Sequence, residues 1–269
     1  MRWENFRRSS NVSDRRGMGA KSVGGVGGIF ALALVVYLLG GNPASLIMEG
    51  VNRTIQSSAS RPSKISPEQQ AEQADFAAAV LGSTEDVWSQ YVQGGTYPPA
   101  RMVLFAGATD TACGTGQSAM GPFYCPNDQS VYLDLDFFYE LDEKLGAPGD
   151  FARAYVIAHE IGHHIQNLKG DLNKRKNNES SVRTELQADC YAGVWAHDVQ
   201  EFGALEDGDL EEAIRAAGSV GDDKLQEKAQ GYAVPDSFTH GSAQQRMKWF
   251  KIGFESGKPA QCDTFSGKI

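Results

Sequence analysis

Two histidines and a glutamate lie close together in His159-Glu160-Ile161-Gly162-His163, a segment of the form H-E-x-x-H. On a helix, residues four apart project from the same face, so both imidazoles can reach one metal ion. Zinc suits such a pair, because it accepts imidazole nitrogen and prefers tetrahedral sites. Glu160 can take a proton from a zinc-bound water as that water attacks a substrate. The pattern predicts that His159 and His163 bind one Zn²⁺ per chain, with Glu160 as general base.

A catalytic zinc also needs a third protein ligand and an open position for water. Glu185 follows His163 by 22 residues (185 − 163), which leaves room for a turn and an antiparallel second helix. Asp189 lies four residues further, on the same helix face, where it can accept a ring N–H from a ligand histidine. We predict Glu185 as the third metal ligand and Asp189 as the partner that orients a histidine. Taken alone, both pairs are also typical of an ordinary helix surface.

Hydrolysis through an oxyanion benefits from a second donor besides the metal. His240 is the best candidate, because it follows a loop and opens a helix in Thr239-His240-Gly241-Ser242. A purely structural histidine at a helix start is the alternative interpretation. Tyr191 and Tyr232 are weaker candidates for the same role.

Two further histidines are not expected to take part in the chemistry. His164 lies about 100° round the helix from His163, so we expect it to be a bystander. His197 ends the second helix, where we expect it to interact with the negative end of the helix dipole.

The elements that position these residues are predicted to be mainly helical. A proline and a glycine precede Asp150, which is expected to cap an apolar helix running through Leu168. A second helix is predicted from about Ser181 to His197, and two more after Asp207 and over residues 242–254. Burying a His-Glu-His cluster on so apolar a helix would be costly without a metal, which argues against a plain surface helix.

A small strand region separates these helices from earlier ones. Residues 71–81 read as one helix and Ser83 opens another, whereas residues 102–105 read as a short strand. Alternating apolar and polar residues over Val131–Phe138 predict a half-exposed strand. Such a strand could offer an unpaired edge to an extended substrate, or it could be an ordinary core strand. The order of elements predicts an α+β domain, mainly helical with a small β-sheet.

Composition bounds the class of protein. The chain has 269 residues, 41% of them hydrophobic and 22% charged, which is typical of a globular protein. The net charge of −9 argues against binding to nucleic acid phosphates, so no nucleic acid partner is expected. The pattern leaves the oligomeric state open.

Charge and hydropathy divide the N-terminal quarter into three parts. Residues 1–22 form a basic tail, with six basic side chains against two acidic ones. Residues 23–41 are an uncharged, apolar run close to the roughly 20 residues that span a bilayer. Residues 42–67 contain three prolines and read as a linker, which leaves 68–269 as the zinc metallopeptidase domain.

The same pattern predicts membrane topology. Positive charge before the apolar run favours a cytoplasmic N-terminus, a single transmembrane helix and a catalytic domain in the periplasm or outside the cell. A cleaved signal peptide and a buried core helix are the alternatives. The H-E-x-x-H segment lies more than 100 residues beyond the run, so cleavage inside the bilayer is not expected.

Four cysteines fit an oxidising compartment. Cys113, Cys125, Cys190 and Cys262 allow three disulfide pairings, and the sequence alone does not choose among them. A Cys113–Cys125 bridge would clip a local loop and leave Cys190–Cys262 to tie the C-terminal tail to a helix. Four reduced thiols are the alternative, and no close C-x-x-C pair indicates a zinc knuckle.

Together these motifs resemble known metallopeptidases. The H-E-x-x-H of 159–163 followed by Glu185-x-x-x-Asp189 resembles the gluzincin pattern of thermolysin-like, zincin-fold enzymes over roughly residues 130–200. Nearly the whole chain is similar to the bacterial, membrane-anchored “putative neutral zinc metallopeptidase” family. That resemblance rests on the basic start, the apolar run and three blocks, Gly121–Pro126, Val131–Asp134 and Glu185–Gly193. It implies the same ligands, base and orienting aspartate, and attachment to a bacterial inner membrane.

The function that we predict is hydrolysis of peptide bonds in a peptide or protein substrate, by Glu160-assisted attack of zinc-bound water. A non-catalytic, membrane-anchored binding or scaffold protein that retains the zincin-like fold is the alternative. Glu160 speaks against it, because a purely structural site has no use for a carboxylate that binds no metal. A hydrolase of non-peptide substrates is a third possibility.

Overall fold

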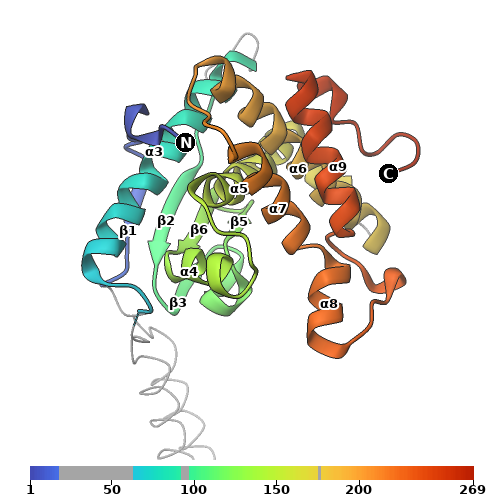
Figure 1. Ribbon diagram of the computed structural model, residues 1–269, viewed down its shortest axis with the longest axis horizontal. Coiled ribbons are helices and arrows are strands. Elements are labelled where there is room, and N and C mark those ends of the chain that lie inside the picture. The colour runs from blue at the N-terminus through green and yellow to red at the C-terminus, as the bar shows by residue number, and fades with distance from the viewer. Residues whose placement is uncertain (18–62, 92–96, 175–176) are drawn as a thin grey trace, which may run out of the picture.

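A small mixed sheet and a thick layer of helices make up the described part of the chain (Figure 1). The computed structural model describes residues 1–17, 63–91, 97–174 and 177–269. The strands are β1 (Val12–Asp14), β2 (Arg101–Phe105), β3 (Ala108–Thr111), β4 (Gly114–Gln117), β5 (Phe123–Cys125) and β6 (Ser130–Asp134). The helices are α3 (Pro67–Tyr91), α4 (Asp136–Glu143), α5 (Asp150–Lys169), α6 (Asn178–Glu201), α7 (Asp209–Ser219), α8 (Asp222–Gln230) and α9 (Ala243–Ser256). Short 3₁₀ turns are η1 (Trp3–Asn5), η2 (Ser118–Met120), η3 (Asp171–Lys174), η4 (Pro235–Ser237) and η5 (Pro259–Gln261). The mainly helical α+β prediction is confirmed.

The main sheet has the strand order β1-β2-β6-β5. β1, β2 and β6 are parallel, and β5 runs antiparallel to β6 at one edge. Alternate residues of β2 and β6 join the main hydrophobic core, namely Met102, Leu104, Val131 and Leu133. The opposite face forms a smaller cluster built on Val103, Phe105, Cys125 and Tyr132. The β3–β4 hairpin lies beside this cluster, because a Cβ added to Gly116 would come within 2.4 Å of the Phe123 ring.

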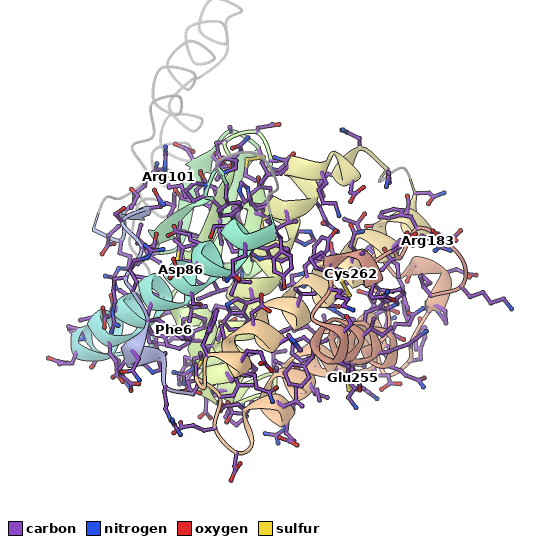
Figure 2. The ribbon with its side chains drawn as sticks, turned by 90° about the horizontal axis from the view of Figure 1, so that it is seen from above. Phe6, Asp86, Arg101, Arg183, Glu255 and Cys262 are labelled. Carbon is purple, nitrogen blue, oxygen red and sulfur yellow. A yellow bond between two sulfur atoms is a disulfide. The ribbon has the colours of Figure 1, made fainter. Side chains whose placement is uncertain are left out.

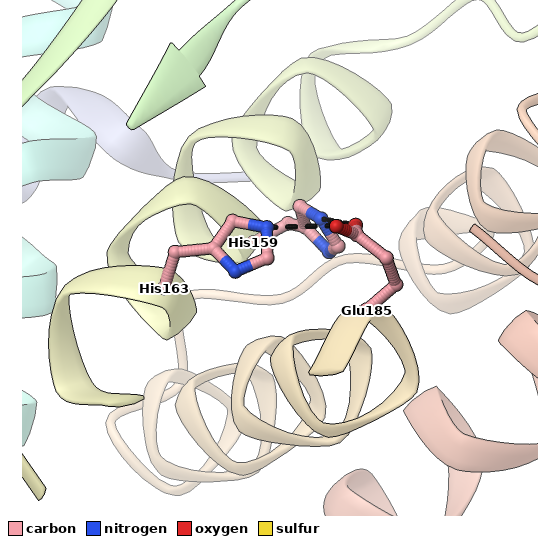
Figure 3. A group of neighbouring side chains, drawn as sticks. All are labelled: His159, His163 and Glu185. Carbon is pink, nitrogen blue, oxygen red and sulfur yellow. Dashed lines mark hydrogen bonds and ion pairs between the residues drawn. The ribbon is translucent and has the colours of Figure 1, made fainter. Parts of the chain in front are cut away.

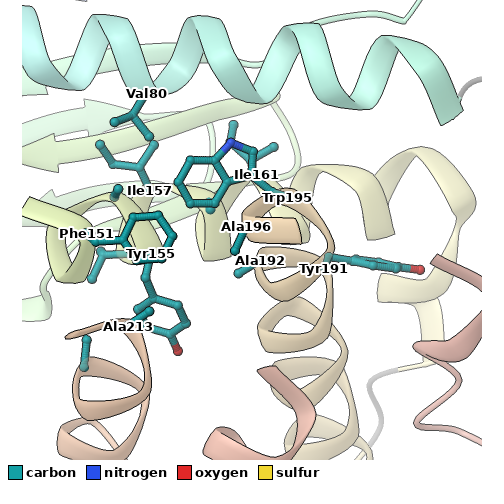
Figure 4. Packing of buried hydrophobic residues seen from close by; sticks show 14 of the residues in the cluster. Val80, Phe151, Tyr155, Ile157, Ile161, Tyr191, Ala192, Trp195, Ala196 and Ala213 are labelled. Carbon is teal, nitrogen blue, oxygen red and sulfur yellow. The ribbon is translucent and has the colours of Figure 1, made fainter. Parts of the chain in front are cut away.

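The main core joins the sheet to the helices. In Figure 4, Val80 of α3, Ile157 of α5 and Trp195 of α6 point into one apolar region. Phe151 stacks on Trp195 with ring centroids 5.6 Å apart, which fixes the start of α5 against α6. Helix α5, which carries the H-E-x-x-H segment, therefore lies in the interior, with α3, α6 and α7 packed around it.

The predicted strand over Val131–Phe138 is wrong in its length and in its exposure. It ends at Asp134, and α4 begins at Asp136. The Asp134 carboxylate accepts the backbone N–H of Asp136 at 3.0 Å, and this local bond turns the chain out of the sheet. The strand is buried on both faces and lies between β2 and β5, so it is not half-exposed, and of the two interpretations the ordinary core strand is confirmed.

The break predicted between residues 81 and 83 is also absent, since α3 is one continuous helix of 25 residues. Ser83 and Thr84, which look like helix-capping residues, donate their hydroxyls to the carbonyls of Val80 and Leu81 within the helix. Gly82 is tolerated because the chain crosses there, as a Cβ would lie 2.0 Å from the carbonyl oxygen of Arg7.

The N-terminal residues that we expected to form a separate tail are part of this unit. β1 pairs with β2 over Val12–Asp14, and residues 1–17 run along α3 (Figure 1). None of the helices within the described residues is long and apolar enough to cross a membrane. The predicted transmembrane run 23–41 and most of the predicted linker 42–67 lie outside the described residues.

Both disulfides have the pairing in which Cys113 and Cys125 close a local loop. Cys113 is bonded to Cys125, and Cys190 to Cys262, so no described cysteine is free. The first bridge joins the β3–β4 turn to β5. The second ties α6 to the segment after α9, near the Cys262 label in Figure 2.

Candidate metal centre

The H-E-x-x-H residues lie on helix α5, in the interior of the domain. The helix begins at Asp150 after Gly149, and the Glu212 carboxylate of α7 accepts the Phe151 backbone N–H at 3.1 Å. The N-cap is Gly149, so the prediction of Asp150 as cap is off by one residue, and the Glu212 carboxylate acts as a cap from α7. Gly170 ends the helix in the left-handed conformation, one residue after Lys169.

His159, His163 and Glu185 converge as the sequence predicts (Figure 3). Oε2 of Glu185 lies 3.3 Å from Nε2 of His159 and 3.5 Å from Nε2 of His163. Hydrogen bonds of this type are commonly about 2.9–3.0 Å long. Donor atoms on a tetrahedral zinc with bonds of about 2.0–2.1 Å would be about 3.3–3.4 Å apart. The two distances from Glu185 to the imidazoles therefore fit the edges of a zinc tetrahedron better than a pair of hydrogen bonds.

Among the described residues, no histidine, cysteine or acidic side chain supplies a fourth donor to such a tetrahedron. Within the described residues, the cluster contains only these three histidine or acidic side chains, all buried or nearly so. A structural zinc site typically has four protein ligands, whereas a catalytic one keeps a position open. The donor set of two imidazoles and one carboxylate thus fits a catalytic zinc.

His159 is oriented through its other ring nitrogen. Nδ1 of His159 lies 2.8 Å from Oδ1 of Asp189, so a proton on Nδ1 leaves the Nε2 lone pair free for a metal. The same aspartate oxygen accepts the Tyr155 hydroxyl at 2.5 Å. Arg246 from α9 donates Nη2 to Oδ1 and Nε to Oδ2, each at 2.8 Å. The carboxylate of Asp189 is therefore fixed on both oxygens.

His163 is oriented by a different residue. Its Nδ1 lies 2.8 Å from Oε1 of Gln166, one helical turn further along α5. The amide nitrogen of Gln166 donates to the Thr184 carbonyl at 2.6 Å and to Oε1 of Gln187 at 3.1 Å. These two bonds turn the acceptor oxygen of Gln166 towards His163, so α6 holds both histidines in their metal-binding tautomers.

A close crossing of α5 and α6 brings the ligands together. A Cβ added to Gly162 would lie 2.9 Å from the carbonyl oxygen of Ala188 and 3.0 Å from its Cα. Gly162 is one of the two unspecified positions of the motif, and Ala188 lies between Glu185 and Asp189. The glycine therefore allows the backbone of α6 to approach α5 closely at the ligands.

Burial and charge act in opposite directions on the ligands. Burial by itself lowers the pKa of His159, but Asp189 and Glu185 outweigh it and raise the pKa to about 9. The pKa of His163 is also raised, against burial, chiefly by Glu185. Burial would raise the pKa of Glu185, but the two histidines hold it well below its usual value. In the metal-free protein, a proton therefore occupies the space where a cation would bind.

Glu160 differs from every other acidic residue of the site. Its side chain is buried to all but 8% of its surface, yet it makes no hydrogen bond or ion pair with any described residue. None of its oxygens is both fully buried and unsatisfied, so the carboxylate retains contact with solvent. A carboxylate that is free, next to the first ligand and reached by water has what a general base needs.

His240 lies on a loop that packs beside the third ligand. A Cβ added to Gly241 would approach side chains of Val182 and Leu186, which flank Glu185 on α6. The His240 ring itself bonds Asp222 at 3.1 Å and is half exposed. None of its contacts involves a metal ligand, so its role as oxyanion donor stays a prediction.

The weaker candidates are placed elsewhere. The Tyr191 hydroxyl is engaged by Lys169 at 2.8 Å, and Tyr232 is exposed on a loop. Neither contacts a ligand among the described residues.

The remaining histidines are structural. Nε2 of His164 bonds the Pro98 carbonyl at 2.7 Å and Nδ1 accepts from Tyr124, which fits a bystander whose pKa burial lowers. His197 does not end α6, which continues to Glu201. Its Nδ1 instead donates to the Phe254 carbonyl at 2.8 Å, so it contacts the C-terminal turn of α9 and not, as predicted, that of its own helix.

Three positioning residues escaped the sequence analysis, namely Tyr155, Gln166 and Arg246. A polar amide one turn after the second histidine on an apolar helix was a usable signal for Gln166. Arg246 is 4% exposed, but nothing in a helix of mixed composition marks one arginine as buried. Its partner Asp189 lies 57 residues away, so only the folded chain reveals the pair.

Comparisons with known proteins agree with this site. Residues 1–265 match the family described as “Putative neutral zinc metallopeptidase”. The chain is 48% identical to “Uncharacterized protein YpfJ” of Escherichia coli (strain K12), with the whole of both chains covered. It is 46% identical to “Uncharacterized protein Rv2575” of Mycobacterium tuberculosis (strain ATCC 25618 / H37Rv), over 70% of this chain and 69% of that protein. No solved structure matches the chain.

Proposed function

The chain belongs to the family described as “Putative neutral zinc metallopeptidase”, and from this membership we propose that it is a zinc-dependent peptidase. His159, His163 and Glu185 hold the ion, and Asp189 and Gln166 keep the two imidazoles in the tautomer that binds metal. When bound, zinc polarises a carbonyl and makes a coordinated water easier to deprotonate.

Glu160 supplies the proton transfer. Its carboxylate takes the proton that the attacking water loses and delivers it to the leaving amine. The observation that carries the proposal is this free carboxylate beside a cluster in which Glu185 lies at zinc-ligand spacing from both imidazoles. His240 is retained as the candidate donor to the oxyanion, on the strength of its loop packing beside Glu185.

We propose a peptide or protein as the substrate, bound in extended form. β6 cannot receive it, but β5 is an edge strand that pairs only with β6 among the described strands. Tyr124 of β5 bonds His164, the residue after the second ligand, so this edge lies against α5. An extended peptide added to β5 would run along the helix that carries the metal ligands.

A non-catalytic scaffold that keeps the fold and the zinc is the alternative. It accounts for the three ligands equally well. It gives no reason for an unpaired, solvent-contacting carboxylate in a cluster where the other acidic groups are bonded. Catalysis gives that reason.

The test compares the wild-type chain with Glu160→Gln, measuring zinc content and turnover of casein or a peptide library. We expect one zinc per chain in both, and turnover lower by at least about 100-fold in the variant, because a general base typically contributes 10²–10⁴. Glu201→Gln, an exposed change at the end of α6, is the matched control and should retain full turnover. Zinc in every variant with turnover in none would favour the scaffold.

A further inference from the structure

Residues 1–17 are bound along a surface made by α3, β2 and the loop between α6 and α7. Backbone bonds run from Arg2 to Ala204, from Ser9 to Ala78 and from Arg15 to Leu104, each 2.8–2.9 Å long. β1 adds to the edge of the sheet beside β2, in register from Val12 opposite Met102. Backbone bonds of this kind, spread along the whole segment, are those of an integral part of a fold.

Helix α3 is shaped for this segment. Gly82 faces the carbonyl oxygen of Arg7, and any Cβ there would lie 2.0 Å from that oxygen. Glu85, one turn on, accepts the Ser9 hydroxyl at 2.6 Å and the Asn11 amide at 2.7 Å. Glu85 is only 9% exposed, and within the described residues its hydrogen bonds all come from residues 7–11.

The arginines of the segment are paired with acidic residues of the same unit. Arg7 bonds Glu85 and Asp86, and Arg8 bonds both oxygens of Asp75 at 2.9 and 2.6 Å. In Figure 2, Phe6 lies on the same side of the molecule as α3, the helix that carries Asp86. These are charges on which the prediction of a cytoplasmic N-terminus rests, and here they neutralise the surface of the domain instead.

The first residue closes an acidic cluster at the start of the metal-binding helix. The Met1 ammonium lies 2.9 Å from both oxygens of Asp150, the first residue of α5, and 3.2 Å from Asp209 and Glu206. The carboxylates of Asp150, Asp209 and Glu212 also lie close to one another. Asp209 is buried and Asp150 and Glu212 are partly buried, and the ammonium pairs with two of these three carboxylates.

We propose that residues 1–17 are a structural part of the metallopeptidase domain and lie on the same side of the membrane as residues 63–269. A strand cannot pair with β2 through a bilayer, so a cytoplasmic N-terminus with an extracytoplasmic domain is incompatible with this fold. Gly17 and Ser63, which flank residues 18–62, belong to one folded unit. The two disulfides place that unit in an oxidising compartment, outside the cytoplasm.

Single-cysteine labelling tests the shared side. Ser10→Cys and Lys251→Cys are both at exposed positions, and the four natural cysteines are in disulfides. We expect a membrane-impermeant maleimide to label both variants in intact spheroplasts. Labelling of Lys251→Cys before lysis and of Ser10→Cys only after lysis would overturn the proposal. Labelling of both only after lysis would keep the shared side and overturn the extracytoplasmic placement.

A helix substitution tests the docking separately, in the full chain. Alanine is favoured over glycine inside a helix, so Gly82→Ala should raise the melting temperature if nothing covers it. With the Arg7 carbonyl in place, the same change must push the segment away, and we expect the melting temperature to fall. Ser89→Ala, on the exposed side of α3, is the control and should not lower it. A rise for Gly82→Ala would show that residues 1–17 are not docked. Neither test depends on zinc or on peptidase activity.

Discussion

Each ligand histidine is held through its second ring nitrogen, but by a different kind of residue. Asp189 is an anion that is itself neutralised by Arg246, whereas Gln166 is a neutral amide held by the α6 backbone. The Asp189 carboxylate pKa stays below its usual value despite burial, first because of Arg246 and then because of His159. Orientation of both rings therefore depends on residues that never touch the metal.

Arg246→Lys tests this dependence. Lysine keeps the charge but cannot bond both oxygens of Asp189, so the carboxylate gains freedom and His159 is less well oriented. We expect zinc affinity to fall about 10–100-fold, measured by competition with a chromophoric chelator. Arg183→Lys is the matched control, because Arg183 bonds the carbonyls of Thr264 and Gly267 and contacts no ligand. An unchanged affinity for Arg246→Lys would contradict the positioning role.

The pH dependence of the metal-free protein follows from the same residues. The His159 pKa is raised from 6.5 to about 9, so its contribution to stability is complete below pH 6.5 and is lost as pH rises through 9. Glu185 and Asp189 have lowered pKa values, so their contribution is lost as pH falls below their usual values of 4.5 and 3.8.

Melting curves in EDTA should therefore show stability falling between pH 6.5 and 9. Zinc needs the imidazoles without their extra proton, so the rise in melting temperature on adding zinc should grow over the same range. A flat profile in EDTA from pH 6.5 to 9 would contradict the protonated, metal-free site.

At the residue scale, the sequence predicted which histidine and acidic side chains lie together, and their roles as ligands and base stay predictions. His159, Glu160 and His163 are adjacent on one helix, and Glu185 and Asp189 share a face of the next, so periodicity alone brings each set together. Arg246 could not be predicted, because its role depends on how α9 packs on α6.

At the scale of elements, glycines set the distances between the helices of the site. Gly162 allows α5 to approach α6, while Gly193 and Gly253 allow α6 to approach α9. A Cβ on Gly253 would lie 1.9 Å from the Cys190 carbonyl oxygen, directly after Asp189. The Arg246–Asp189 pair depends on this second close crossing.

Gly162→Ala should therefore act on the metal as well as on stability. The new methyl group meets the backbone of Ala188, which has no flexible end to move aside. We expect the free energy of unfolding to fall by about 1–3 kcal/mol, as for other overpacked interiors. Zinc affinity should fall too, because Glu185 moves away with α6. Chemical denaturation with and without zinc measures both, and a variant that is as stable as the wild type would show that the crossing is looser.

The elements were predictable where a single period runs through them. The helices around His159 and Glu185 were expected at nearly their observed bounds. The strand after Val131 was extended too far, because the first residues of α4 continue its alternation of apolar and polar side chains. The chain leaves the sheet at Asp134 all the same. Local side chain to backbone bonds of this kind are invisible to periodicity.

For the whole molecule, the two disulfides close loops of very different length. Cys190–Cys262 spans 72 residues and Cys113–Cys125 spans 12. Loop entropy predicts that the longer bridge contributes about 4.4 kcal/mol and the shorter about 3 kcal/mol. The longer bridge is also attached to α6 at Cys190, the residue that follows Asp189.

Replacing Cys190 and Cys262 together by serine should therefore lower both the free energy of unfolding and zinc affinity. The Cys113, Cys125 double serine variant is its control, and we expect it to lower stability less and leave zinc affinity unchanged. Equal losses of zinc affinity in the two variants would contradict the link between the C-terminal bridge and the site.

The arrangement of the N-terminal residues was only partly predictable from the sequence. A basic, arginine-rich start predicts a tail equally well whether or not it folds back onto the domain.

The most direct test of the account is the position of zinc itself, measured by anomalous scattering at the zinc edge in crystals of the zinc-loaded chain. The account predicts one peak within about 2.0–2.2 Å of Nε2 of His159, Nε2 of His163 and a Glu185 oxygen, with no fourth protein ligand. A peak elsewhere, a Glu185 carboxylate more than about 4 Å from the ion, or a fourth protein ligand that closes the site would contradict it.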